Sequence, residues 1–435
     1  MNLKTIAFNH SQLTGELTVP GDKSISHRAV MLGSIAEGTT RITGFLDGED
    51  CLRTIDIFRQ LGVSIEREGT NVTIHSPGMK NWTMPEGELY AGNSGTTARL
   101  MLGILAGSNV TSVLTGDEYL SKRPMNRVSL PLRLMGASIE GQPDSNLLPL
   151  TISGSSLQAI DYEMPVASAQ VKSAILLAGL NAEGKTSVSE QTVSRDHTER
   201  MLEQFGVSIE QKGKTVSVEG GAELKGTDVH VPGDISSAAF FMVAAAIKEG
   251  NWITFNNVGL NPTRTGILDV LEKMGAAIEI VDQKGEIGEP YGTVKVAYNR
   301  LQGTEVSGEL IPRLIDELPV IALLATQAKG TTIIKDAAEL RVKETDRIAA
   351  VTAELKKLGA NIEETEDGMI IHGPTPLSGG TLFSYGDHRI GMMAAIASIV
   401  AKDPITIQDV ACINISYPTF FEHLEKLTSP SNVNG

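Results

Sequence analysis

Residues 19 to 28 have the sequence VPGDKSISHR, in which small polar and cationic side chains stand directly before apolar residues at helical spacing. Pro20 and Gly21 end the preceding strand, so we expect Ser24 to Ser26 in the first turn of a helix. Free backbone N–H groups and the positive end of the helix dipole make such a turn attractive to anions. Taken alone, the segment fits an ordinary serine-capped helix with two solvated cations equally well.

Repetition of this pattern favours the anion site. Cations, carboxylates and small polar residues stand before helices that are apolar on nearly every face, and such helices belong in the centre of a domain. A purely structural repeat does not need charge at these positions. Arginine forks bind phosphate and carboxylate groups, so the pattern predicts a small substrate with several negative charges. The six segments are GDKSISHRAVMLGSIA, GNSGTTARLMLGILAG, VASAQVKSAILLAGL, GDISSAAFFMVAAAI, LIDELPVIALLATQA and GDHRIGMMAAIASIVA.

A second repeat indicates the elements that position these segments. Amphipathic stretches such as RTIDIFRQ and VTAELKK are each followed by a glycine and then by a short alternating segment. The glycine is typical of a helix C′ position, and the residues after it are typical of a strand. Each repeat of about 70 residues is therefore expected to hold a strand, a buried helix, a strand, a surface helix and further strands. The five copies are LGVSIE, MGASIE, FGVSIE, MGAAIE and LGANIE, at Gly62, Gly136, Gly206, Gly275 and Gly359.

The sequence VPGD occurs at Val19 and again at Val231, which indicates two halves of three α/β units each. Both copies are typical of hinges. We expect one domain at residues 20–231 and a second formed by residues 1–19 together with 232–435. A solenoid of stacked repeats is the competing architecture, but the unequal spacings and wholly apolar helices favour two closed α/β domains.

Composition excludes several classes of function. The 435 residues carry a formal net charge of −15, which argues against nucleic acid as a partner. Cys51 and Cys412 have no metal-ligand spacing, so we expect reduced thiols, no metal and a cytoplasmic protein. The longest apolar run, Ala238 to Ile247, is too short to span a bilayer, and the first residues lack a signal peptide, so no membrane association is expected.

Single motifs are less specific. Asp22 separates Gly21 from Lys23, so GDKS does not match a phosphate-binding loop, and GNSGTT lacks the spacing of a dinucleotide site. The KETDR run at 343–347 is most simply a solvated salt-bridge ladder. The remaining candidates are expected to be core or capping residues, namely His27, His388, Met135, Met274, Met392 and Met393.

Together, seven motifs in order closely resemble the 5-enolpyruvylshikimate-3-phosphate synthase family, from about Gly15 to Phe420. The resemblance implies a two-domain inside-out α/β barrel of the enolpyruvyl transferase type, with six βαβαββ-like units, three per domain. It implies transfer of the enolpyruvyl group of phosphoenolpyruvate to the 5-hydroxyl of shikimate 3-phosphate, with release of phosphate through a tetrahedral intermediate in a cleft between two closing domains. This is a step of the shikimate pathway toward chorismate and aromatic amino acids, and a glyphosate target. No cofactor is implied, and we expect a monomer. The motifs are VPGDKSISHRA, GNSGTTARL, RPMNR, SAQVKSAILLAGL, SRDHTE, RVKETDR and GDHRI.

The same resemblance implies the roles of individual residues. Asp316 would take the proton of the attacking hydroxyl, and Glu344 with Lys23 would deliver a proton to the methylene carbon. An acid, a base and fixed cations are what this addition and elimination require. Shikimate 3-phosphate would be bound by Lys23, Ser24, Arg28, Ser168, Gln170, Arg195, Asp316 and Lys343. Phosphoenolpyruvate would be bound by Lys23, Asn93, Gly95, Arg123, Gln170, Glu344, Arg347 and Arg389.

Departures from the family pattern at Leu100, Ala169 and Ile415 place the chain nearer the second class of the family. The nearest rival is the transferase that acts on UDP-N-acetylglucosamine, which has a reactive cysteine where TGDEYLSKRPMNR has none. RNA 3′-phosphate cyclase shares related units, but the acidic charge and the missing nucleotide motif count against it. A non-catalytic anion-binding protein on this scaffold remains the other class, although it should have lost Lys23, Asp316 or Glu344.

Overall fold

The computed structural model describes residues 2–141, 146–285 and 287–428. Two compact units divide the chain. Unit 1 comprises Met1–Pro20, Pro232–Lys284 and Pro290–Gly435, and unit 2 comprises Gly21–Val231 with Gly285–Glu289. The sequence analysis anticipated neither the place of Pro20 in unit 1 nor that of Gly285–Glu289 in unit 2. The predicted division into domains at residues 20–231 and at 1–19 with 232–435 stays a prediction.

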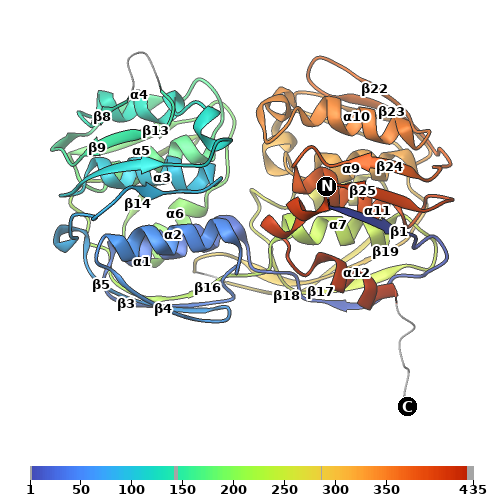
Figure 1. The fold of residues 1–435 in the computed structure, drawn as a ribbon, viewed down its shortest axis with the longest axis horizontal. Coiled ribbons are helices and arrows are strands. Elements are labelled where there is room, and N and C mark those ends of the chain that lie inside the picture. The colour runs from blue at the N-terminus through green and yellow to red at the C-terminus, as the bar shows by residue number, and fades with distance from the viewer. Residues whose placement is uncertain (1, 142–145, 286, 429–435) are drawn as a thin grey trace. The chain divides into compact units, whose positions relative to one another are not determined.

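Unit 2 contains three four-stranded sheets that share one topology, in which the first pair of strands is parallel and the other pairs are antiparallel (Figure 1). The first sheet has the order β16 (Asp228–His230), β3 (Glu37–Thr43), β5 (Asn71–Pro77) and β4 (Ser64–Glu68). The second is β6 (Leu89–Tyr90), β7 (Thr111–Thr115), β9 (Leu150–Ser153) and β8 (Ser138–Glu140). The third is β11 (Asp161–Glu163), β13 (Lys185–Ser189), β15 (Thr215–Glu219) and β14 (Ile209–Lys212), beside a short pair of β10 (Leu157–Gln158) and β12 (Ala182–Glu183).

Unit 1 repeats this plan with strands from the start of the chain. The first sheet is β18 (Ala277–Lys284), β19 (Tyr291–Ala297), β17 (Trp252–Gly259) and β2 (Thr14–Leu17), and β2 runs parallel to β17. The second is β20 (Glu305–Val306), β21 (Gly330–Ile334), β23 (Met369–Gly373) and β22 (Asn361–Glu364). The third has three strands, β1 (Leu3–Ile6), β25 (Ile405–Gln408) and β24 (Gly380–Phe383), and it is followed by α12 (Phe420–Thr428).

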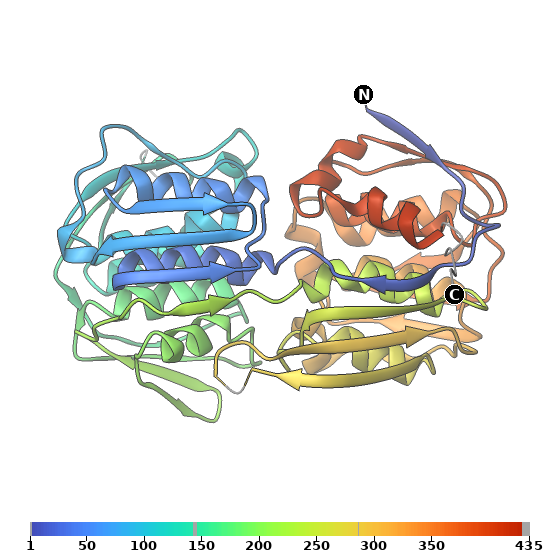
Figure 2. The ribbon, with the colours of Figure 1, turned by 90° about the horizontal axis from the view of Figure 1, so that it is seen from below.

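Within each unit the sheets surround helices that lie next to one another (Figure 2). Every residue of α7 (Ile235–Ala246) and α9 (Leu318–Thr326) is buried, as apolarity on every face predicts. In unit 2, α3 (Gly95–Ala106) and α5 (Ala169–Gly179) approach so closely that a Cβ at Gly103 would lie 2.2 Å from the Ala174 carbonyl oxygen. The other buried helices are α1 (Lys23–Ile35) and α11 (His388–Ala397).

The outer helices bury one side only, and their ends confirm the second repeat. They are α2 (Glu49–Gln60), α4 (Asn126–Leu134), α6 (His197–Gln204), α8 (Gly266–Lys273) and α10 (Arg347–Lys357). After each, the repeat glycine has a positive φ, between 87° and 95°, and its N–H donates to the carbonyl three residues earlier. The next residue donates to the carbonyl five residues earlier, which completes a Schellman motif. The sequence phrase is therefore the signal that turns each outer helix into a strand.

The starts of the buried helices differ in one detail from the sequence prediction. Helix α1 begins at Lys23, and Asp22 rather than a serine is its N-cap, since the carboxylate accepts the N–H of Ile25 at 2.9 Å. Asp234 and Asp387 cap α7 and α11 in the same way, whereas Ser94 caps α3. Aspartate competes with serine here because its carboxylate also favours the positive end of the helix dipole. Among the described residues, none of the helices has the length and apolar character needed to cross a membrane.

Candidate active site

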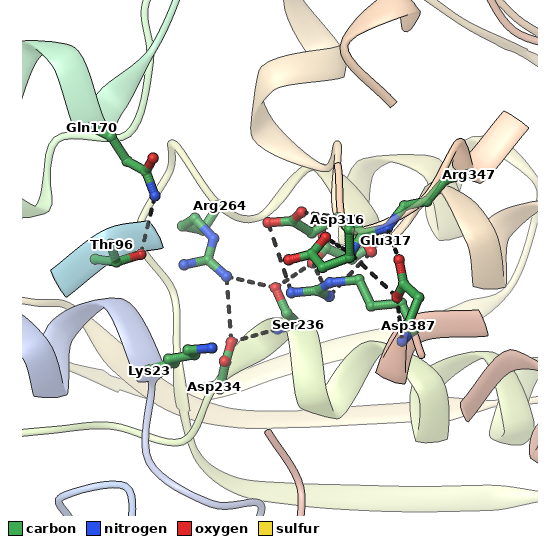
Figure 3. Close-up of polar contacts among 12 residues, drawn as sticks. Lys23, Thr96, Gln170, Asp234, Ser236, Arg264, Asp316, Glu317, Arg347 and Asp387 are labelled. Carbon is green, nitrogen blue, oxygen red and sulfur yellow. Dashed lines mark hydrogen bonds and ion pairs between the residues drawn. The ribbon is translucent and has the colours of Figure 1, made fainter. Parts of the chain in front are cut away.

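Arg347 is the centre of an arginine–carboxylate cluster in unit 1 (Figure 3). It is the first residue of α10, and its side chain is only 1% exposed. Nε lies 2.8 Å from Asp387 Oδ2, Nη1 lies 3.2 Å from Asp316 Oδ1, and Nη2 lies 2.6 Å from Glu344 Oε2. Burial disfavours the charged guanidinium, but the three carboxylates outweigh it and raise the pKa of Arg347 above its usual value. The interpretation of KETDR as a solvated ladder is therefore wrong for Arg347.

Arg389 approaches Asp316 from α11. Its Nη1 donates to the backbone oxygen of Asp316 at 3.1 Å, and its Nη2 lies 3.8 Å from Asp316 Oδ2. The Asp316 side chain is thus held between two guanidinium groups. Lys343, half-buried at the end of a 3₁₀ turn, stands just before Glu344, and burial lowers its pKa while Asp316 opposes that shift. Four sequence-predicted residues are therefore brought together, and we define the arginine–carboxylate cluster as Asp316, Glu344, Arg347, Asp387 and Arg389.

Polar contacts that the sequence did not predict extend from this cluster. Arg264, which is 3% exposed, donates from Nη2 to Ser236 Oγ at 2.6 Å and to Asp234 Oδ1 at 3.3 Å. The Ser236 hydroxyl donates in turn to Oε1 of the buried Glu317, and Arg389 Nη1 lies 3.9 Å from the same oxygen (Figure 3). Ser236 had a usable signal, because it follows the second VPGD as Ser24 follows the first. Arg264 had none.

In unit 2, Lys23 is the first residue of α1, and its ammonium forms an ion pair with Asp50 of α2. The carbonyl of Ser24 accepts Arg28 Nη1 at 3.0 Å. Arg28 is 4% exposed, and burial lowers its pKa to about 10 while Glu199 opposes the shift, so the guanidinium is still charged at neutral pH. Its Nε donates to Thr198 at 2.7 Å and its Nη2 to Ser173 at 2.8 Å. Arg28 therefore ties the start of α1 to α5 and α6.

The GNSGTT segment places further candidates at the start of α3. Gln170 accepts from Arg99 Nη1 at 2.8 Å and donates to Thr96 Oγ1 at 3.0 Å, which fixes the orientation of its amide (Figure 3). Asn93 accepts from Arg123 Nη2 at 3.1 Å. A Cβ at Gly95 would lie 2.8 Å from Arg99 Nη1 and 3.6 Å from Arg123 Nη1, so the guanidinium groups of both arginines lie beside this glycine.

Two other predicted residues lie near the starts of α5 and α6. Ser168 is the N-cap of α5, where its hydroxyl accepts the N–H of Val171, and Arg195 is half-buried two residues before α6. Close by, Lys172 is 1% exposed, and its Nζ lies 2.8 Å from both Glu190 and Glu199. Desolvation opposes its charge, but the two carboxylates raise the pKa of Lys172. Burial raises the pKa of Glu199, although the ammonium of Lys172 opposes the shift.

His27 is fully buried, so the prediction that it is a core residue is confirmed. The same prediction is confirmed for the four methionines. Its Nδ1 lies 2.8 Å from Thr54 Oγ1 and 3.4 Å from Thr97 Oγ1, so it joins α1 to α2 and α3. Burial and, to a lesser extent, the charge of Lys23 together lower its pKa to about 3. His27 is therefore neutral in the folded protein.

Replacing His27 with asparagine is expected to flatten the dependence of stability on pH. The pKa of His27 is lowered by folding, so its contribution is complete above about 6.5 and is lost as pH falls toward 3. One such group reduces the free energy of unfolding by at most about 1.4 kcal/mol per pH unit in that window. Urea denaturation of both proteins from pH 7 to pH 4 should show the difference in unfolding free energy shrinking as pH falls. Parallel pH profiles would contradict a neutral His27.

Across residues 2–141, 146–285 and 287–428, no group of three or more histidine, cysteine, aspartate or glutamate side chains could hold a metal ion.

Comparison with solved structures places this arrangement in the enolpyruvyl transferase fold. The enolpyruvyl transferase NikO from Streptomyces tendae matches with a TM-score of 0.78 at 18% identity, over 98% of each chain, which establishes the fold alone. The EPSP synthase of Acinetobacter baumannii matches with a TM-score of 0.90 at 46% identity, again over 98% of each chain. The chain belongs to the EPSP synthase family (3-phosphoshikimate 1-carboxyvinyltransferase), whose family model matches residues 9–424.

Relatives of known name agree with this assignment. A 3-phosphoshikimate 1-carboxyvinyltransferase of Bacillus pumilus is 59% identical over 422 residues, which is 96% of this chain and 98% of that protein. One of Bacillus cereus is 57% identical over 427 residues, 98% of this chain and 100% of that protein. The resemblance inferred from seven motifs is confirmed, and so is the predicted fold class.

Proposed function

We propose that this protein transfers the enolpyruvyl group of phosphoenolpyruvate to the 5-hydroxyl of shikimate 3-phosphate and releases inorganic phosphate. The observation that carries the proposal is the arginine–carboxylate cluster, in which Asp316 lies between two guanidinium groups and Glu344 contacts one of them. It occurs in a chain 59% identical to a protein named 3-phosphoshikimate 1-carboxyvinyltransferase. The reaction joins two anions, so fixed cations and a pair of proton-transferring carboxylates suit it.

The reaction is an addition followed by an elimination. In the addition, the 5-hydroxyl oxygen bonds to the central carbon of phosphoenolpyruvate, the hydroxyl proton goes to a base, and an acid protonates the methylene carbon. The product is a tetrahedral intermediate that carries a methyl group and the phosphate. In the elimination, the bond to the phosphate oxygen breaks and the methyl group loses a proton, which restores the double bond.

Asp316 is proposed as the base for the hydroxyl, and Glu344 as the acid for the methylene carbon with help from Lys23. Geometry supports the division of labour between the two carboxylates. Asp316 is held on two sides, by Arg347 and Arg389, as a fixed base should be. Glu344 has one oxygen on Arg347, and its side chain is 36% exposed, so it is accessible to a substrate.

The remaining predicted residues are proposed as anion-binding groups. Arg347, Arg389 and Arg123 are suited to the carboxylate and phosphate of phosphoenolpyruvate because guanidinium forks bind such groups bidentately. Gln170 has an amide whose orientation is fixed, which suits contact with both substrates. Asn93 and Gly95 are proposed to bind phosphoenolpyruvate with these three arginines. The residues proposed to bind shikimate 3-phosphate with Lys23 are Ser24, Arg28, Ser168, Arg195 and Lys343. A monomeric, cytoplasmic enzyme without a cofactor stays a prediction.

The test is release of phosphate from phosphoenolpyruvate by the purified protein, without added metal. Turnover is expected with shikimate 3-phosphate and not with UDP-N-acetylglucosamine as the acceptor. Turnover only with the sugar nucleotide would favour the rival transferase. No turnover with either acceptor, together with measurable binding of both anions by calorimetry, would favour the non-catalytic anion-binding protein.

A further inference from the structure

Glu354 lies away from the arginine–carboxylate cluster, yet it has an unusually complete set of partners. It stands on α10 seven residues after Arg347, about two helical turns along the same face. Its side chain is fully buried. Oε1 accepts from the Tyr385 hydroxyl at 2.7 Å and Oε2 from the Phe383 N–H at 3.0 Å, while Lys357 Nζ lies 2.8 and 2.9 Å from the two oxygens.

The segment that Glu354 holds leads directly into α11. Tyr385 has φ of +58°, which is unfavourable for a side chain of its size, so something must fix this turn. Partial burial and the bond to Glu354 together raise the pKa of Tyr385 to about 12, which keeps the phenol protonated as a donor. Two residues later Asp387 caps α11, and its carboxylate also accepts Arg347 Nε at 2.8 Å.

Helix α10 is therefore fastened to one turn at two points. Its first residue, Arg347, bonds to the end of the turn at Asp387, and Glu354 bonds to the beginning of the turn. Arg389, the second residue of α11, follows the turn directly and reaches Asp316. The position of Arg389 relative to Arg347 thus depends on the conformation of residues 383–387.

We propose that Glu354 is a positioning residue for phosphoenolpyruvate binding, because it fixes the turn that places Arg389 beside Arg347. This inference rests on the proposed function. Glu354 acts through the turn, since its oxygens contact Phe383, Tyr385 and Lys357 and neither arginine of the cluster. A fixed distance between two guanidinium groups matters most for a small dianion that both must hold at once.

The simpler interpretation is a stabilising ion pair between Glu354 and Lys357. These two residues are three apart on one helix, and the Lys357 side chain is 48% exposed, so water screens the ammonium side of the pair. Lys357 provides the matched control, because Lys357→Gln removes the ion pair and leaves both bonds to the turn. Tyr385→Phe does the opposite, as it removes one bond to the turn and keeps the ion pair.

The test compares Glu354→Met, Tyr385→Phe and Lys357→Gln with the parent enzyme in full kinetics. Tyr385→Phe is expected to raise KM for phosphoenolpyruvate at least threefold and Glu354→Met at least tenfold, with KM for shikimate 3-phosphate changed less than twofold in both. Lys357→Gln should leave both values unchanged. Equal changes in both KM values, or no change in Tyr385→Phe and Glu354→Met, would overturn the positioning role. If Glu354→Met does not fold, the two KM values of Tyr385→Phe alone test the positioning role.

Amide hydrogen exchange over residues 383–389 provides a readout that needs no substrate. Exchange is expected to accelerate at least tenfold in Tyr385→Phe and Glu354→Met and to be unchanged in Lys357→Gln. Faster exchange with an unaltered KM for phosphoenolpyruvate would show that Glu354 stabilises the turn without affecting substrate binding, and would overturn the proposal. An inactive parent enzyme would overturn both the proposed function and the positioning role. Amide hydrogen exchange would still show whether Glu354 stabilises the turn at residues 383–387.

Discussion

Replacing Asp316 with asparagine is expected to lower kcat by about a thousandfold while KM for phosphoenolpyruvate does not rise. The amide keeps the shape of the side chain but cannot accept the proton of the attacking hydroxyl, and removal of a positioned base costs 10²- to 10⁴-fold. Arg347 and Arg389 keep their other contacts, to Asp387 and to the backbone oxygen of residue 316, so the cations stay in place. Steady-state kinetics with both substrates varied would measure the two parameters separately.

The matched control is Asp269→Asn. Asp269 also pairs with an arginine, since its Oδ2 lies 2.5 Å from Arg313 Nη1, but its side chain is 40% exposed and lies outside the arginine–carboxylate cluster. That variant should keep the kcat of the parent enzyme. A kcat for Asp316→Asn within tenfold of the parent value would mean that another group takes the proton.

Replacing Lys172 with methionine is expected to destabilise the protein by about 3–5 kcal/mol at neutral pH, because it leaves buried carboxylates without their cation. The penalty should shrink as pH falls. Burial already raises the pKa of Glu199, and loss of the ammonium that opposes this shift raises it further, so the folded variant binds a proton before the unfolded chain does and gains stability relative to the parent. Chemical denaturation at pH 7.5 and pH 5.5 would show both effects.

The triple variant Lys172→Met, Glu190→Gln, Glu199→Gln tests the cause. It removes the charges together, so it should recover part of the lost stability at pH 7.5 and show little dependence on pH. A loss below about 1 kcal/mol in Lys172→Met would show that the lysine does not offset buried carboxylate charge. A penalty that grows toward acid pH would show that other groups keep the carboxylates charged in the folded variant.

Local signals allowed much of the fold to be predicted. The glycine after each outer helix must adopt a positive φ, and only that geometry lets the next N–H reach back over the last turn, so the LGVSIE phrase specifies a helix end wherever it occurs. The buried helices were visible for a similar reason, because apolarity on every face is incompatible with a surface position. Asp22 was missed as a cap because aspartate and serine satisfy the same N–H groups.

Partners far apart in sequence could not be predicted from local patterns. Arg347 and Asp387 are separated by 40 residues, and Ser236 and Glu317 by 81. The residue spacing within one segment therefore cannot predict either contact. The motif RVKETDR recovered Arg347 because Arg347 is its last residue. Asp316 lies outside the seven motifs, in the apolar segment LIDELPVIALLATQA, and its proposed role came from the family resemblance. Arg264 and Glu354 lie outside every motif, and only the folded structure shows that they bond to residues next to the cluster.

The pairing of β1 and β2 has a consequence for the order of events during synthesis on the ribosome. Unit 2 can close its first sheet once β16 (Asp228–His230) has been made. Residues 14–17 can pair only after Trp252–Phe255 have been made, and residues 3–6 only after Ile405–Gln408, the last strand among the described residues. Two strands made early therefore pair late, which gives unit 1 a higher contact order and a later completion than unit 2.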